Sequence, residues 1–199
     1  MSEPGAGIAA IVLAAGASTR LGKPKQLIDI DGESLLRRTV RLARESGCAP
    51  VFVVLGSEAE RMRSEIENLA ATPLINDGWS AGMGSSLRRG MEAVCAMDPQ
   101  PYAVLVLVCD QPKLAVEHLR RLTVGQRTAG GGIAASAYAG RMGVPVIFGR
   151  EFYPELLELQ GDRGAREVIR RHAEAVRAVP WAEGELDVDE PGDLARLRV

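Results

Sequence analysis

Long apolar runs are missing from this 199-residue sequence, since no stretch approaches the roughly 18 apolar residues that a membrane-spanning helix needs. A basic leader followed by an apolar segment and a cleavage-like site is missing as well. The two absences argue against membrane insertion and against export. We therefore expect a cytoplasmic protein with no membrane partner.

A large excess of charge of either sign is also missing. The chain has 24 Lys and Arg residues against 26 Asp and Glu residues, which gives a formal net charge of -2, and these residues are dispersed along the sequence. A broad polyanion-binding face needs clustered basic residues. The composition therefore predicts no nucleic-acid partner, and any phosphate recognition must be local.

Cysteine and histidine are scarce. The three cysteines are Cys48, Cys95 and Cys109, and none forms a C-x-x-C pair, so neither a disulfide framework nor a zinc site is indicated. Cys95 and Cys109 lie in helical and strand patterns, where we expect small buried hydrophobic residues. The two histidines, His118 and His172, lie in Arg-rich helical patterns, and we expect both to be solvated.

What is present fits one globular domain, residues 1–199. The chain is 46% hydrophobic, which is enough for one substantial core, and it has no internal repeat, linker or low-complexity run. Apolar segments alternate with amphipathic ones. The expected strands are 8–15, 51–55, 72–76, 102–109, 133–139, 144–148, 175–179 and 186–189. The expected helices run from Ser34 to Gly47, from Ser57 toward Leu69, from Ser85 or Ser86 through Met97, over 115–124, over 152–159, and from Pro191.

This order of elements predicts an α/β fold, a single-domain three-layer doubly wound, mostly parallel sheet with a small antiparallel element at 133–148. Helix ends carry local signals: Ser34 can cap one helix start, Gly47 can close its end, and Ser57 with Glu60 matches a capping box. In such sheets, ligands bind beyond the carboxyl ends of the strands.

A polar loop follows the first expected strand, at that edge of the sheet. It holds two glycines, two hydroxyls and the cations Arg20, Lys23 and Lys25. Backbone N–H groups of a glycine-containing turn, together with nearby cations, suit a polyphosphate. The loop is neither G-x-x-x-x-G-K-[ST] nor G-x-G-x-x-G. The sequence therefore predicts an anion site of a less common type.

Acidic residues mark the same edge. Asp110 directly follows the most apolar strand, 102–109, and a carboxylate there is a natural ligand for Mg²⁺. Asp187 and Asp189 alternate along a late strand, so both can reach the cleft and their spacing does not choose between them. Trp79 lies in a polar, glycine-rich loop, where it either covers a ligand or fastens the loop to the domain, with nothing to favour one role. Two arginines in segment 161–166 suggest a second anion site.

The ordered motifs of the chain resemble those of molybdenum cofactor cytidylyltransferases, nucleotidyltransferases that share the sugar-nucleotide pyrophosphorylase fold. The resemblance covers nearly the whole chain. It is carried by L-A-A-G-x-S-x-R-x-G-x-x-K at 13–25, N-x-x-W-x-x-G-M-x-x-S-L at 76–87, D-Q-P at 110–112, G-V-P at 143–145, G-D-R-G-A-R at 161–166 and D-V-D-x-P-x-D-L at 187–194.

The resemblance implies transfer of CMP from CTP to the molybdopterin form of the cofactor, with Mg²⁺ and release of pyrophosphate. It implies a nucleotide site of Leu13, Ala14, Ala15, Gly16, Ser18, Arg20, Lys25, Gly82 and Ser86, in which Arg20, Lys25 and Asp110 are catalytic. It places the metal on Asp110 with Asp187 or Asp189, and the acceptor beside Gly143, Pro145, Asp162 and Arg166. A molybdenum hydroxylase that receives the cofactor is an expected protein partner.

Three alternatives stay open. Ala15 matches the L-A-A-G form that resembles CTP-using relatives, whereas L-A-G-G resembles the guanylyltransferase branch, so guanylyl transfer or a sugar-phosphate acceptor is the first alternative. A non-catalytic nucleotide-binding maturation chaperone is the second, although such a binder needs no paired metal ligands. The third is an NAD(P)-dependent oxidoreductase, which the missing G-x-G-x-x-G disfavours.

Overall fold

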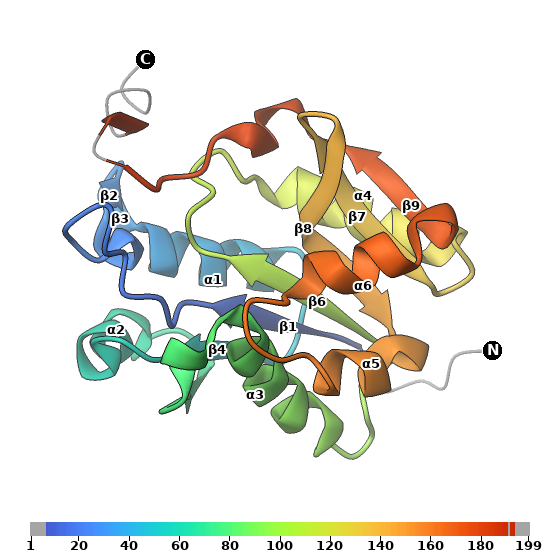
Figure 1. The fold of residues 1–199 in the computed structure, drawn as a ribbon, viewed down its shortest axis with the longest axis horizontal. Helices are drawn as coiled ribbons and strands as arrows, with labels where there is room; N and C mark the ends of the chain where they lie inside the picture. Colours follow the sequence, from blue (N-terminus) through green and yellow to red (C-terminus); the bar gives the residue numbers. More distant parts are fainter. Residues whose placement is uncertain (1–6, 191, 194–199) are drawn as a thin grey trace.

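The computed structural model describes residues 7–190 and 192–193. A seven-stranded sheet of order β5-β4-β1-β6-β8-β7-β9 forms its centre (Figure 1). The strands are β1 (Ile8–Leu13), β4 (Val51–Leu55), β5 (Thr72–Ile75), β6 (Ala103–Val108), β7 (Ile133–Tyr138), β8 (Arg141–Gly149) and β9 (Val176–Pro180). Strand β8 runs antiparallel to both of its neighbours, and the other pairings in the sheet are parallel. The mostly parallel sheet and the antiparallel element at 133–148 are therefore confirmed.

Helices cover both faces of this sheet. Helices α1 (Leu35–Glu45), α2 (Ala59–Ile66) and α4 (Val116–Thr128) pack on one face, and α3 (Met83–Cys95), α5 (Tyr153–Leu157) and α6 (Ala165–Arg171) pack on the other. The reason is visible in β1, where Ala10 and Val12 belong to one core cluster while Ile11 and Leu13 belong to the other. A strand buried on both faces accounts for the continuous apolar run of the sequence. The three-layer architecture is confirmed.

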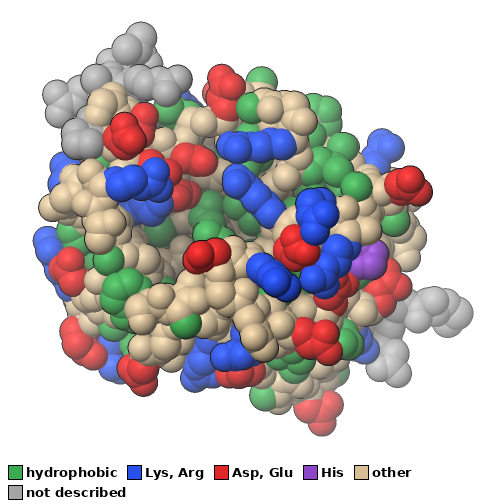
Figure 2. All heavy atoms as spheres, in the orientation of Figure 1, with side chains coloured by type: hydrophobic (Ala, Val, Ile, Leu, Met, Phe, Trp, Pro, Cys, Tyr) green, Lys and Arg blue, Asp and Glu red, His purple; other side chains and the backbone are tan. Residues whose placement is uncertain are grey.

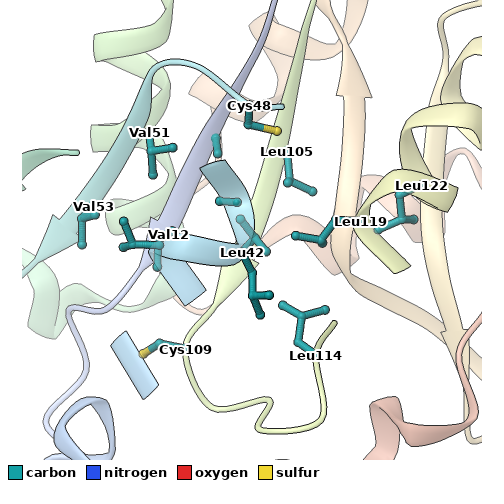
Figure 3. Close-up of a cluster of buried hydrophobic side chains, with 14 of the residues drawn as sticks. Val12, Leu42, Cys48, Val51, Val53, Leu105, Cys109, Leu114, Leu119 and Leu122 are labelled. Carbon is teal, nitrogen blue, oxygen red and sulfur yellow. The ribbon is translucent and has the colours of Figure 1, made fainter. Parts of the chain in front are cut away.

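Figure 3 shows the core on the α1 side of the sheet. Val12 and Leu105 from the central strands face Leu42 of α1 and Leu119 and Leu122 of α4, and all are at most 5% exposed. The opposite face brings α3 unusually close to β1, because a Cβ at Gly90 would lie 2.7 Å from Cγ2 of Ile11. This close approach lets α3 pack directly against β1.

A small third cluster fastens the segment around Val188 to the loop that follows β1 and to the start of α1. Val188 is fully buried against Leu21, Ile28 and Leu35. The same region contains a two-stranded antiparallel ribbon, β2 (Asp29–Ile30) with β3 (Glu33–Ser34), that the sequence pattern did not predict. The cluster fixes the residues on either side of Val188 at the edge of the sheet.

The predicted helix starts are partly wrong. Ser34 caps α1 by accepting a hydrogen bond from Arg37 N at 3.3 Å, and Gly47 adopts a positive φ, as predicted. Helix α2, however, begins after Glu58 in a left-handed conformation with no side-chain cap, so the capping box from Ser57 does not form. Helix α3 begins at Met83 and contains Ser85 and Ser86, because their hydroxyls are engaged in the loop before the helix and not at its first N–H groups.

Tertiary contacts contradict two further predictions. Residues 186–189 form no strand, and Val188 N makes a single backbone hydrogen bond to Asp110 O at 2.9 Å. His118 is 1% exposed, stacks on Trp181 and has Nε2 at 2.7 Å from Ser136 Oγ, so it is not solvated. Burial, with a smaller effect of Arg121, lowers the pKa of His118 to about 4 and keeps the ring neutral.

The remaining expectations can be placed briefly. His172 is partly exposed, with Nε2 at 2.7 Å from a Glu155 carboxylate oxygen. The cysteines are free; Cys48 and Cys109 are buried and Cys95 is partly buried. The helix expected from Pro191 lies outside the described residues. No helix in the described part of the chain is long and apolar enough to cross a membrane.

Candidate active site

A pocket of about 340 Å³ opens where β1 and β6 end. All residues of the predicted nucleotide site line it except Ser18 and Arg20, and Asp110 and Asp162 line it too. Figure 2 shows a hollow near the middle of this face, with Lys and Arg side chains gathered on the side where β8 and α6 lie. The pocket therefore lies where parallel α/β sheets bind ligands.

Gln26 organises the loop that closes one side of the pocket. Its side chain is 1% exposed, and Nε2 donates to Ala14 O at 3.0 Å and to Gly16 O at 2.8 Å. Ser18 donates to Gln26 Oε1 and accepts from Lys25 N, which explains why Ser18 holds the loop and does not line the pocket. Gln26 is not among the predicted site residues, and the one signal for it in the sequence is a long amide side chain directly after Lys25.

Lys25 joins segments that are far apart in the chain. Its Nζ lies 2.5 Å from Asp110 Oδ2 and 3.0 Å from Asp189 Oδ1, and Arg20 Nη2 lies 3.2 Å from Asp189 Oδ2. Burial alone would lower the pKa of Lys25, but the negative charge of Asp110 and the hydrogen bonds to both carboxylates outweigh burial and raise it. The predicted catalytic residues Lys25 and Asp110 are thus in direct contact, and Arg20 is linked to Lys25 only through Asp189.

Asp187 lies on the other side of the buried Val188 and also approaches Asp110. Burial and the charge of Asp110 raise the pKa of Asp187 to about 6, and the Gln111 amide and the Arg166 guanidinium act in the opposite direction. The Oδ1 atoms of Asp110 and of Asp187 are buried and have no hydrogen-bond partner within the described residues. Both carboxylates therefore have lone pairs free for a further ligand.

The two carboxylates that contact Lys25 have the chemistry of ligands for a divalent cation. Within residues 7–190 and 192–193, no three His, Cys, Asp or Glu side chains are grouped so as to hold a metal alone. Mg²⁺ is usually bound by one or two carboxylates together with substrate phosphates and water. Asp110 and Asp189, which converge on one ammonium, supply such a pair.

Trp79 fastens its loop to the domain, which is one of the two roles that the sequence left open, and it also lies at the pocket. It lines the pocket, and it packs so tightly on the chain after β4 that a Cβ at Gly56 would lie 2.5 Å from its Cγ. Alanine at position 56 would displace the indole. Trp79 is therefore fastened to the domain and also forms part of the pocket wall.

The predicted acceptor residues are only partly brought together. A Cβ at Gly82 would lie 2.7 Å from Asp162 Oδ1, so the loop that contains Gly82 and segment 161–166 are in contact. A Cβ at Gly143 would lie 3.4 Å from Arg166 Nε. Pro145, in contrast, is buried in β8, where its carbonyl accepts a hydrogen bond from Ser136 at 2.6 Å. Segment 161–166 therefore connects the pocket with the start of β8.

Comparisons with known proteins show which family has this fold. The chain is 31% identical to the nicotine blue oxidoreductase of Paenarthrobacter nicotinovorans over 96% of each chain. It is 29% identical to a probable molybdenum cofactor guanylyltransferase of Trichormus variabilis, over 96% of this chain and 90% of that protein. The crystal structure of Rv0371c from Mycobacterium tuberculosis superposes with a TM-score of 0.81 at 31% identity, and the match covers 96% of this chain and 97% of that one. A manganese complex of Rv0371c superposes with a TM-score of 0.76 at 28% identity and the same coverage. The family model of the MobA-like NTP transferase domain matches residues 10–176, and the chain therefore belongs to the MobA-like NTP transferase family of nucleotidyltransferases.

Proposed function

We propose that this nucleotidyltransferase moves CMP from CTP to the molybdopterin form of the molybdenum cofactor and releases pyrophosphate. The observation that carries the proposal is the convergence of Lys25, Asp110 and Asp189 beside a pocket formed by the L-A-A-G strand end and the Gly82 loop. Such a transfer requires neutralisation of the charge on the phosphoryl group and in-line positioning of the reacting groups. Each has a candidate group in this pocket.

In this proposal each group of pocket residues has a separate role, which depends on where it lies. Backbone groups of Ala14 to Gly16 and the cations Arg20 and Lys25 bind the β and γ phosphates. A phosphate oxygen of the acceptor attacks the α phosphorus, the bond to the β-phosphate oxygen breaks, and pyrophosphate leaves. The nucleophile belongs to the substrate, so the site needs no catalytic triad.

Nucleotidyltransferases of this fold use divalent metals. In this proposal Asp110, with Asp189 or Asp187, holds Mg²⁺, which when bound offsets negative charge on the phosphates. In this proposal Arg166, whose guanidinium lies near Gly143 and whose charge acts on Asp187, binds an anionic acceptor. A molybdenum hydroxylase receives the product.

The alternatives are tested by one set of assays. Pyrophosphate release is measured with CTP or GTP in the presence and absence of molybdopterin, and nicotinamide absorbance is followed in parallel. The relative named nicotine blue oxidoreductase makes the second measurement necessary. Turnover of NADPH without pyrophosphate release would replace the transferase by the oxidoreductase, and nucleotide binding without either reaction would indicate the chaperone.

Removing the charge of Lys25 is expected to expose the metal site. Two unit charges about 4 Å apart interact by about 4 kcal/mol at an effective dielectric constant of 20, so the ammonium competes with a cation for Asp110 and Asp189. Without nucleotide, Lys25→Met should bind Mn²⁺ at least about tenfold more tightly than wild type. Electron paramagnetic resonance of free Mn²⁺ measures this.

Lys23→Met is the matched control, because Lys23 is exposed and is not among the ion pairs of these carboxylates. Equal Mn²⁺ affinity in wild type and Lys25→Met would contradict the competition between ammonium and metal.

Arg20→Ala is expected to weaken binding of CTP by about 1–2 kcal/mol, because Arg20 is exposed and solvent screens its contact with a phosphate. Binding of CMP should not change, since CMP lacks the β and γ phosphates. Calorimetry of both nucleotides tests this, with Arg44→Ala as a control on an exposed helix position. Equal losses for CMP and CTP would show that the variant disturbs the loop and not a phosphate contact.

A further inference from the structure

Asn76 lies at the end of β5, is 8% exposed, and has an amide orientation that its neighbours determine. Its Oδ1 is 3.1 Å from Gly78 N, and a backbone N–H can only donate, so this atom must be the oxygen. The amide nitrogen therefore faces Ser85 and Ser86, each at 3.0 Å from Nδ2. Asn76 thus donates to both serine hydroxyls.

The two serines then differ in what their own hydrogens can do. Ser85 donates to carbonyl oxygens of the loop, to Gly82 O at 2.8 Å and to Gly78 O at 3.1 Å. Ser86 accepts from Asn76, and its hydroxyl has no acceptor within the described residues. Ser86 is 5% exposed and lines the pocket, whereas Ser85 does not line it. The Ser86 hydroxyl is therefore a donor with a free hydrogen at the pocket wall.

We infer that Asn76 is a positioning residue for base recognition, which holds the Ser86 hydroxyl as an obligatory hydrogen-bond donor toward an acceptor atom of the nucleobase. This inference rests on the nucleotide-binding role proposed above. Cytosine offers two such acceptors, O2 and the unprotonated N3, whereas N3 of uracil and N1 of guanine carry hydrogens. A Ser86 hydroxyl that is held as a donor toward the pocket favours a base that presents an acceptor atom to it, as cytosine does with O2 and N3.

Asn76→Asp separates this role from simple support of the loop. The new carboxylate has nearly the same shape and can still accept from Gly78 N, but it cannot donate. Ser86 must then turn its hydrogen toward position 76, and the pocket loses its donor. Ser86→Ala removes the donor directly.

The test is calorimetric binding of CTP and of inorganic tripolyphosphate, which lacks the base and the ribose. Asn76→Asp and Ser86→Ala should each weaken CTP binding by about three- to tenfold, the range of one neutral hydrogen bond, and leave tripolyphosphate binding unchanged. The double variant should bind CTP no more weakly than the weaker single variant, because both changes remove the same contact. Ser85→Ala, the matched control, should stay within about twofold of wild type.

Losses that add in the double variant, or equal losses for tripolyphosphate, would overturn the inference and make Asn76 a support for the loop only. An unchanged CTP affinity in Ser86→Ala would overturn it as well. A preference of the wild type for GTP would instead refute the proposed choice of nucleotide, and the same variants measured with GTP would then decide the role of Asn76 separately.

Discussion

Asp110→Ala is expected to lower the rate of pyrophosphate release by on the order of 10²- to 10³-fold, the loss typical of a missing charge-stabilising group at a transferred phosphoryl. Asp110 stands at the carboxyl end of β6, its Oδ2 contacts Lys25, and its Oδ1 has no partner among the described residues. The core of the sheet does not depend on this side chain, so the fold should persist. Release of pyrophosphate and a thermal unfolding curve are measured on the same preparation.

Glu174→Ala is the control for this experiment, since it also removes one carboxylate but from an exposed position in the turn before β9. Its rate should equal that of wild type. Near wild-type turnover of Asp110→Ala with Mg²⁺ would show that the metal is not held there. Loss of the cooperative unfolding transition would show that Asp110 is a structural residue.

Wild type is expected to favour CTP over GTP by at least about a hundredfold in kcat/KM, because mispaired polar groups in a buried site discriminate strongly. Ala15 lies just after β1 and is 5% exposed, and its carbonyl accepts from Ser57 N at 3.0 Å, which holds the backbone that lines the pocket. Guanine exceeds the outline of cytosine and presents a different order of donors and acceptors. Ala15→Gly removes a methyl group from the pocket wall and should reduce the preference.

Direct competition of the two nucleotides, with molybdopterin as acceptor, measures this preference. A relative of similar length is named as a probable guanylyltransferase, so the outcome decides between two branches of one family. Preference of the wild type for GTP would assign this chain to the guanylyl branch. If the ratio of kcat/KM for CTP to that for GTP is unchanged in Ala15→Gly, another part of the pocket recognises the base.

The sheet could be predicted because its signal is local. Strand β4 spans Val51–Leu55 as expected, and α1 is capped by Ser34, since burial on both faces and capping each leave a pattern within a few residues. The helix starts at Met83 and Ala59 could not be predicted in the same way. Ser85, Ser86 and Ser57 are residue types that often cap helices, but none of them caps a helix here. The left-handed conformation of Glu58 precedes α2, and Asn76 hydrogen-bonds the hydroxyl of Ser85.

By itself the sequence determined the seven strands of the central sheet in their chain order, the loop after β1 and the acidic residue after β6, because each depends on neighbours along the chain. Only the tertiary structure decided that Lys25 meets Asp110 and Asp189, which lie 85 and 164 residues away in sequence. It also decided that His118 is buried and that Gln26 supports the loop. Hydrogen-bond partners and burial depend on which segments the sheet brings side by side. The type of a residue does not indicate which distant segments will lie beside it.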